Sequence, residues 1–191
     1  MRWTVRVATP GDVAAVASIH VRAWRAAYRG MVPDEALDGL VVDRSAERWM
    51  WMVTADADES HVFLAVDGSR TGAFCSVCPV RLPERDAHPQ RPTGELVTIY
   101  ADPAWAGTGA GSAVHDAGLE HLASRGFGHV VLWVLEANQP ARSFYAHRGW
   151  SVDDVRDDFE IGGRRLTEVR YSRRLEPCDR VGASRWSTGG R

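Results

Sequence analysis

Three glycines stand close together in the middle of the chain, at Gly107, Gly109 and Gly111 in the stretch AWAGTGAGSAV. The residues before them, ELVTIYA, have the composition of a strand, and those after them have helical spacing. A glycine-rich turn between a strand and a helix directs backbone N–H groups and the positive end of a helix at an anion. The pattern therefore predicts a phosphate-binding turn for a nucleotide, a dinucleotide or a coenzyme, unless the glycines serve only close packing on a neighbouring strand.

Two of these ligands have strict sequence requirements. A nucleoside triphosphate loop needs a lysine directly after its last glycine, and no lysine follows any of these glycines. A dinucleotide fingerprint needs Gly-x-Gly-x-x-Gly and an acid about 20 residues further on. Gly107 and Gly109 fit that fingerprint, but Ser112 takes the third place, and Glu136 stands near the position of the acid. The clear strand–helix–strand unit occurs once, so the dinucleotide reading is a rival and not the main interpretation.

The elements that must position this turn follow from local patterns. The predicted strands are residues 3–8, 61–68, 70–80, 95–101, 129–135, 150–156 and 164–174, with a hairpin turn at Asp67-Gly68. The predicted helices are residues 9–27, 34–54 (in two pieces around 41–43), 107–125 and 138–148. Residues 81–94 are polar, contain three prolines and predict a long loop.

Composition places the chain among globular proteins of one domain. It has 191 residues, of which 45% are hydrophobic and 25% charged, and its formal net charge is -2. A protein that binds the phosphate backbone of nucleic acids is usually basic, so nucleic acid is not expected as a partner. No apolar run reaches the length of a membrane helix, and the N-terminus lacks a signal-peptide core. We expect no membrane partner, a cytoplasmic location, one domain over residues 1–175 and a flexible tail over 176–191.

The cysteines and histidines do not predict a metal site. Cys75 and Cys78 form Cys-x-x-Cys, but they lie on a predicted strand, where residues three apart point to opposite faces. Cys178 falls in the tail and is expected to be a free thiol. His115 and His121 share a predicted helix at a spacing of six, which does not suit a common metal ion.

Two adjacent segments resemble the GNAT superfamily of N-acetyltransferases. Residues 98–127 resemble its coenzyme-A-binding segment, a strand, then Gln/Arg-x-x-Gly-x-Gly/Ala, then a helix, with Gly109 and Gly111 in the two glycine places. Residues 132–150 resemble its next segment, with an Asn opening a helix that contains a Phe-Tyr pair. The resemblance extends more weakly over residues 4–174. It implies an α/β (α+β) fold with a mixed, largely antiparallel sheet of about six to seven strands, helices on both faces and a splayed central parallel strand pair.

The resemblance implies an acetyl-CoA site. In the family, the strand before the glycines exposes backbone groups to the pantetheine arm, and the glycine turn binds the pyrophosphate. Asn138 matches the residue that binds the pantetheine arm, although a plain helix cap is the other reading. The cofactor-binding residues implied in this way are Ile99, Tyr100, Ala101, Ala106, Gly107, Thr108, Gly109, Ala110, Gly111, Ser112, Asn138, Arg142 and Tyr145.

One position departs from the family pattern. Ala106 stands in the Gln/Arg place, and Thr108 stands where basic residues are common. The loss of a charge-assisted hydrogen bond costs about 1.5–3 kcal/mol unless another cation replaces it. Arg142 and Arg148 are the candidates for that cation.

The resemblance also implies catalytic residues. Tyr145 matches the general acid for the leaving thiolate and lies seven residues after Asn138, which places both on one helix face. Glu95 matches a glutamate that some members use as general base, and a solvated glutamate at the strand end is the alternative reading.

The acceptor site is expected next to these residues. In the family, the first two helices and their loop wall the acceptor pocket. Trp24, Tyr28, Glu95 and Trp133 are therefore the predicted substrate-binding residues, although Trp24 also fits a core position.

The main prediction is an N-acetyltransferase that moves the acetyl group of acetyl-CoA to an amine of a small molecule or a peptide in a ternary complex. The alternatives are a non-catalytic coenzyme-A-binding sensor and a nicotinamide-dinucleotide enzyme that uses Glu136. Dimers are common in the family, so a homodimer is compatible with the resemblance.

Overall fold

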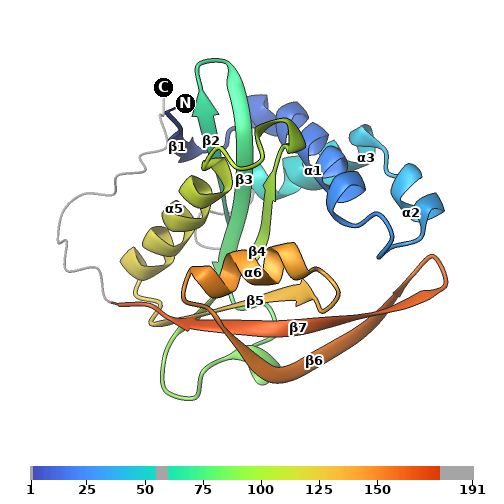
Figure 1. The fold of residues 1–191 in the computed structure, drawn as a ribbon. Helices are drawn as coiled ribbons and strands as arrows, with labels where there is room; N and C mark the ends of the chain where they lie inside the picture. The colour runs from blue at the N-terminus through green and yellow to red at the C-terminus, as the bar shows by residue number, and fades with distance from the viewer. Residues whose placement is uncertain (1, 55–59, 177–191) are drawn as a thin grey trace.

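The computed structural model describes residues 2–54 and 60–176, and the described residues form one seven-stranded sheet (Figure 1). The strands are β1 (Thr4–Val7), β2 (His61–Asp67), β3 (Arg70–Pro79), β4 (Thr93–Ala101), β5 (His129–Leu135), β6 (Ser151–Ile161) and β7 (Arg164–Arg174). Their order is β1-β2-β3-β4-β5-β7-β6, and only β4 and β5 pair in parallel. The predicted mixed, largely antiparallel sheet is confirmed.

Helices cover both faces of the sheet. They are α1 (Val13–Ala27), α2 (Asp34–Asp38), α3 (Val42–Thr54), α4 (Pro83–Asp86), α5 (Ala110–Ser124) and α6 (Gln139–His147), with 3₁₀ turns at η1 (Pro10–Asp12) and η2 (Pro103–Trp105). Alternation along β3 shows the two faces, because Phe74 packs in a core with α1 and α3, whereas Cys75 packs in a core with α5. On the α5 face, a Cβ at Gly94 would lie 2.7 Å from Leu122, so only glycine allows α5 to pack this closely on β4.

The parallel pair separates after three residues. β4 pairs with β5 only from Thr93 to Glu95, while β4 stays paired with β3 as far as Ala101. The β3–β4 register shifts between the Ser76–Thr98 and Val77–Leu96 pairs, so Val97 is an extra residue on β4. A bulge bends its strand and increases the local twist, which explains why β4 leaves β5 at this point. The predicted splay is therefore confirmed, with Val97 as its structural origin.

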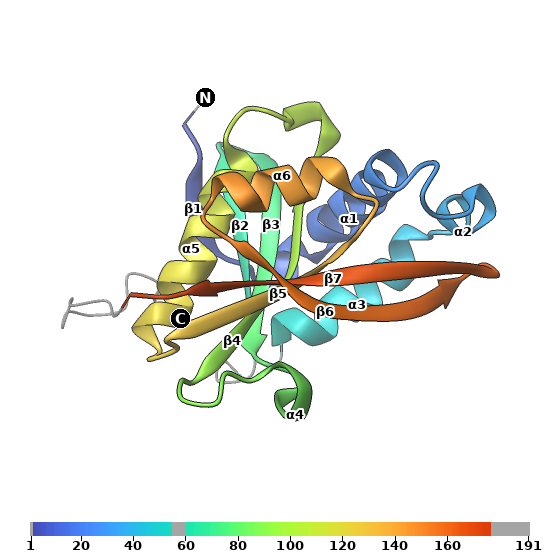
Figure 2. The same cartoon turned by 60° about the horizontal axis from the view of Figure 1, so that its bottom comes forward.

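β6 and β7 form a long hairpin at the edge of the sheet, whose far end reaches toward α2 (Figures 1 and 2). The Arg164 guanidinium donates to the Gly30 carbonyl at 3.2 Å in the loop between α1 and α2. Gly162, in the hairpin turn, lies against Pro33 and Ala36. The hairpin and the α1–α2 loop thus enclose the same end of the molecule.

Most element predictions are confirmed, and two are wrong. The 61–68 and 70–80 strands form the expected hairpin, and the 34–54 region is two helices. The helix predicted from Gly107 begins only at Ala110, because Gly107 and Gly109 have φ of 74° and 89° and form the turn before it. The 81–94 loop contains α4 and the first residues of β4.

The predictions on the cysteines and the tail concern residues that the structure describes only in part. Cys75 and Cys78 diverge as predicted, since Cys75 donates to the Val114 carbonyl at 3.0 Å on the α5 face and Cys78 lies within the electrostatic reach of Glu95. Burial raises the pKa of the Cys78 thiol to about 12. Cys178 and nearly all of the predicted tail lie outside the described residues. Within residues 2–54 and 60–176, no helix is long and apolar enough to cross a membrane.

A buried hydrogen bond fixes α5 to the end of α6. His115 on α5 is fully buried, and its Nε2 accepts the Trp150 indole N–H at 3.0 Å. Burial, the largest cause, lowers the pKa of His115 and keeps the ring neutral, so that it can accept this bond. The bond therefore links α5 to the segment that follows α6, on the same face of the sheet.

We predict that Trp150→Phe lowers the free energy of unfolding by about 1–3 kcal/mol, because it leaves the buried His115 nitrogen without a donor. Urea unfolding measures this loss. Trp51→Phe is the control, because Trp51 is 70% exposed and its substitution should change stability by less than about 0.5 kcal/mol. Equal effects of the two substitutions would contradict the role of this hydrogen bond.

Candidate active site

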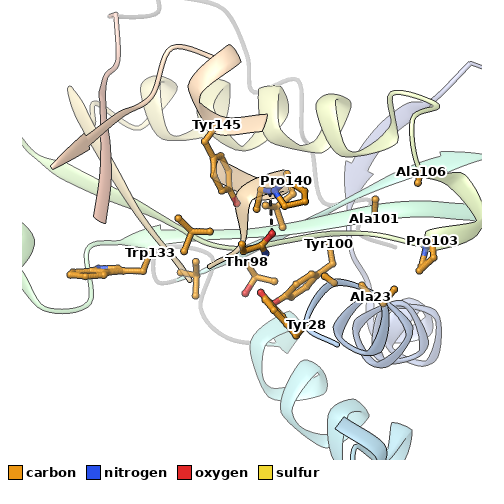
Figure 3. Close-up of a pocket in the computed structure, with 17 residues that line it drawn as sticks. Ala23, Tyr28, Thr98, Tyr100, Ala101, Pro103, Ala106, Trp133, Pro140 and Tyr145 are labelled. Atoms are coloured by element: carbon orange, nitrogen blue, oxygen red, sulfur yellow. Dashed lines mark hydrogen bonds between the residues drawn. The ribbon is translucent and has the colours of Figure 1, made fainter. Parts of the chain in front are cut away.

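A cleft of about 480 Å³ lies between the splayed part of β4 and α6 (Figure 3). Val97 to Ala101 form its floor, and α6 borders it through Asn138, Ala141 and Tyr145. The C-terminal part of α1, including Tyr28, lies on the other side. Because β4 has left β5 here, the backbone groups on this edge of β4 have no strand partner within the described residues, and they border the cleft.

The glycine turn stands at one end of this cleft, next to Ala106. Gly109 caps α5, and the first helical hydrogen bond joins the Ala113 N–H to the Gly109 carbonyl. Within the described part of the chain, the N–H groups of residues 109–112 have no hydrogen-bond acceptor. Among the described residues, nothing lies within 4 Å of the Cβ positions that Gly107 and Gly109 lack, so an anion can approach this backbone closely.

The turn is held by Thr108 and by Trp3, which the sequence did not single out. The Trp3 indole donates to the Thr108 carbonyl at 3.1 Å and to its hydroxyl at 3.2 Å. The Thr108 hydroxyl in turn donates to the Trp105 carbonyl at 2.6 Å. The Ala106 N–H is also engaged, with the Pro103 carbonyl at 3.3 Å. Thr108 and Ala106 therefore shape the turn, and the free donors come from residues 109–112.

Asn138 and Tyr145 both face the cleft, as their spacing predicted. Asn138 lines the cleft, its Oδ1 accepts the Ala141 N–H at 3.2 Å, and among the described residues its amide NH₂ has no acceptor. The cap role and the coenzyme role of Asn138 are therefore compatible. Tyr145 points from α6 toward β4 in Figure 3, and within the described residues its hydroxyl has no hydrogen-bond partner. Burial raises the pKa of Tyr145 above the usual range, so the hydroxyl keeps its proton at neutral pH.

Of the two aromatic residues predicted on α1, only Tyr28 reaches the cleft. Its hydroxyl lies 3.2 Å from the Tyr100 hydroxyl, and burial, above all, raises the pKa values of both. Trp24 packs instead behind Tyr28, with ring centroids 4.8 Å apart, and against His20. The position of Trp24 is that of a core residue and not of a cleft wall.

Glu95 faces a second cavity of about 320 Å³, which adjoins the first at Trp133. Glu95 is 2% exposed, and the Arg81 side chain donates to both of its oxygens at 2.5–3.0 Å. The Arg81 backbone N–H adds a bond of 3.1 Å. Glu95 is thus a buried, fully paired carboxylate, contrary to the solvated alternative. Trp133 lines both cavities, and its indole N–H donates to Asp86 at 3.3 Å.

The structure does not bring Arg142 or Arg148 to the glycine turn. Arg142 donates to the Glu136 carbonyl at 2.9 Å and to the Tyr171 hydroxyl at 3.2 Å, and it lines a separate cavity. Arg148 pairs with Asp116 at 2.7 Å at the far end of α6. Both guanidinium groups have partners elsewhere, so neither is retained as a substitute for the side chain missing at Ala106.

The comparison with protein families identifies the class to which this fold belongs. The family model described as "Acetyltransferase (GNAT) family" matches residues 24–150. The chain therefore belongs to the GNAT acetyltransferase family, and the predicted class of enzyme is confirmed.

Individual relatives agree. The chain is 35% identical over 169 residues to the uncharacterized N-acetyltransferase YuaI of Bacillus subtilis, covering 87% of this chain and 90% of that protein. It is 31% identical over 151 residues to the mycothiol acetyltransferase of Saccharomonospora viridis, covering 78% of this chain and 45% of that protein. The chain thus spans less than half the length of that relative.

Solved structures show the same fold. The PaiA N-acetyltransferase of Thermoplasma acidophilum, solved in complex with coenzyme A, gives a TM-score of 0.73 at 15% identity and covers 91% of this chain and 99% of that one. A ribosomal-protein-alanine N-acetyltransferase of Brucella melitensis gives 0.70 at 19% identity, with coverages of 90% and 99%. At these identities the similarity concerns the fold alone.

We predict that Gly109→Ala weakens coenzyme A binding about tenfold or more, because the methyl group occupies the approach to the free N–H groups. Titration calorimetry with coenzyme A measures the change. Gly126→Ala is the matched control, since Gly126 has nearly the same φ (88° against 89°) at the other end of α5. Both variants should lose about 1–2 kcal/mol of stability. Equal coenzyme A affinity in the two variants would contradict the predicted role of Gly109.

Proposed function

We propose that this chain transfers the acetyl group of acetyl-CoA to a primary amine, in a small molecule or a peptide, by direct attack in a ternary complex. The proposal rests on one observation: the free N–H groups of the glycine turn and the protonated hydroxyl of Tyr145 lie along the same cleft. The first suits a pyrophosphate, and the second suits a leaving thiolate. The donor fits the cleft because the turn is open above Gly107 and Gly109.

The chain's residues then have distinct tasks. The N–H groups of residues 109–112 would hold the pyrophosphate, and the Asn138 amide and the free edge of β4 would hold the pantetheine arm. A backbone N–H on that edge can polarise the thioester carbonyl as it becomes an oxyanion. Tyr145 would donate its proton to the sulfur as the carbon–sulfur bond breaks.

A non-catalytic sensor would need the same binding groups but not an unengaged tyrosine hydroxyl next to the thioester. Tyr145 therefore favours the enzyme. The decisive experiment follows thiol release from acetyl-CoA with polyamines, aminoglycosides, amino acids and N-terminal peptides. We expect turnover with at least one class of amine. Coenzyme A binding without turnover for any of them would support the sensor.

We predict that Tyr145→Phe lowers kcat about 100-fold while coenzyme A affinity stays nearly unchanged, because the variant loses the proton donor but keeps the ring. Steady-state kinetics and calorimetry measure the two quantities. Tyr171→Phe is the matched control, since Tyr171 is also buried but its hydroxyl bonds Arg142, whose side chain lines a separate cavity. If Tyr145→Phe retains the kcat of the wild type, another group or water protonates the thiolate.

A further inference from the structure

The second cavity lies on the opposite face of the sheet from α5, where it meets the cleft at Trp133. Alternation along β5 defines this face, because Leu132 and Val134 pack in the core with α5 and Trp133 points the other way. A group bound in this cavity would thus approach the floor of the cleft from the side not bordered by α6.

Charged side chains line this cavity, and most of them are paired. Arg81 pairs with Glu95 at 2.5 Å. Arg85 pairs with Asp86 at 2.9 Å and with Asp157 at 2.7 Å. These pairs use both arginines of the cavity wall and three of its carboxylates.

Glu168 on β7 is the exception. It lines the same cavity, yet within residues 2–54 and 60–176 its carboxylate has neither an ion pair nor a hydrogen bond. Burial, followed by the negative charge of Asp157, raises the pKa of Glu168 above its ordinary value, and Glu95 adds to the rise. Arg81 and Arg85 act in the opposite direction without contacting it. An unpaired carboxylate in a partly buried site is costly, and a cation or a proton relieves the cost.

Glu168 is also within electrostatic reach of the cleft. Its charge contributes to the raised pKa of Tyr28, after the larger effect of burial, and Tyr28 lines the cleft. Glu95 faces the same cavity, but Arg81 already occupies both of its oxygens. Of the two glutamates, only Glu168 has a carboxylate free to receive a new partner.

We propose that Glu168 binds the ammonium group of the acceptor and accepts its proton, so that the acceptor is a cationic amine entering through the second cavity. This inference rests on the proposed acetyl transfer. The ammonium R–NH₃⁺ gives one proton to the Glu168 carboxylate. The amine R–NH₂ then attacks the thioester carbon, a carbon–nitrogen bond forms and the carbon–sulfur bond breaks. The nitrogen releases its second proton to solvent, Tyr145 gives its proton to the thiolate and regains one from solvent, and Glu168 returns its proton to solvent.

The test compares Glu168→Gln with the wild type, using the amine that gives the fastest turnover in the panel above. We expect kcat/KM to fall about 100-fold or more. The wild-type kcat/KM should rise with pH through the raised pKa of Glu168, and this acidic limb should disappear in the variant. Coenzyme A affinity, measured by calorimetry, should be unchanged. Glu160→Gln, on the exposed part of the same hairpin, is the control and should behave as the wild type.

Asp157→Asn provides a second variant that does not depend on the stability of Glu168→Gln. Removal of the Asp157 charge lowers the pKa of Glu168, so the acidic limb should move to lower pH. The proposal is overturned if Glu168→Gln keeps the wild-type kcat/KM and pH profile, or if the limb stays in place in Asp157→Asn. A wild type that binds coenzyme A but acetylates no amine would instead overturn the proposed function.

Discussion

The separation of β4 from β5 beyond Glu95 is the constraint on which the rest of the site depends. One extra residue, Val97, bends β4 away while its pairing with β3 continues to Ala101. The bend leaves backbone groups without strand partners, which costs free energy unless solvent or a ligand satisfies them. The cleft therefore exists because a backbone irregularity is built into the middle of the sheet.

The two faces of the sheet carry different charges next to this opening. The α5–α6 side offers backbone N–H groups and neutral hydroxyls, and no arginine contacts the glycine turn among the described hydrogen bonds. The other side carries arginine–carboxylate pairs and one unpaired glutamate, Glu168. An anionic donor suits the first side, and a cationic acceptor suits the second. The two sides meet at the splay, which is where the proposed reaction would bring the amine and the thioester together.

The sequence could predict what depends on local spacing. Glycines between a strand and a helix, and the interval of seven between Asn138 and Tyr145, are local patterns that survive folding. The Arg81–Glu95 pair, the partners of Arg142 and the unpaired carboxylate of Glu168 depend on contacts between distant elements. Arg142 lies one helix position from Ala141, which lines the cleft, and that rotation turns its guanidinium toward Tyr171. The bulge at Val97 could not be predicted from the sequence either, because it arises from the register between two strands and is not a property of either strand alone.

Amide hydrogen exchange with and without coenzyme A tests the central claim most directly. The N–H groups of residues 109–112 have no acceptor in the described chain, so they should exchange rapidly in the free protein. The account predicts that coenzyme A slows exchange at these four residues and along Val97 to Ala101. Binding that leaves both segments unprotected, or that protects β5 and Glu136 instead, would contradict it.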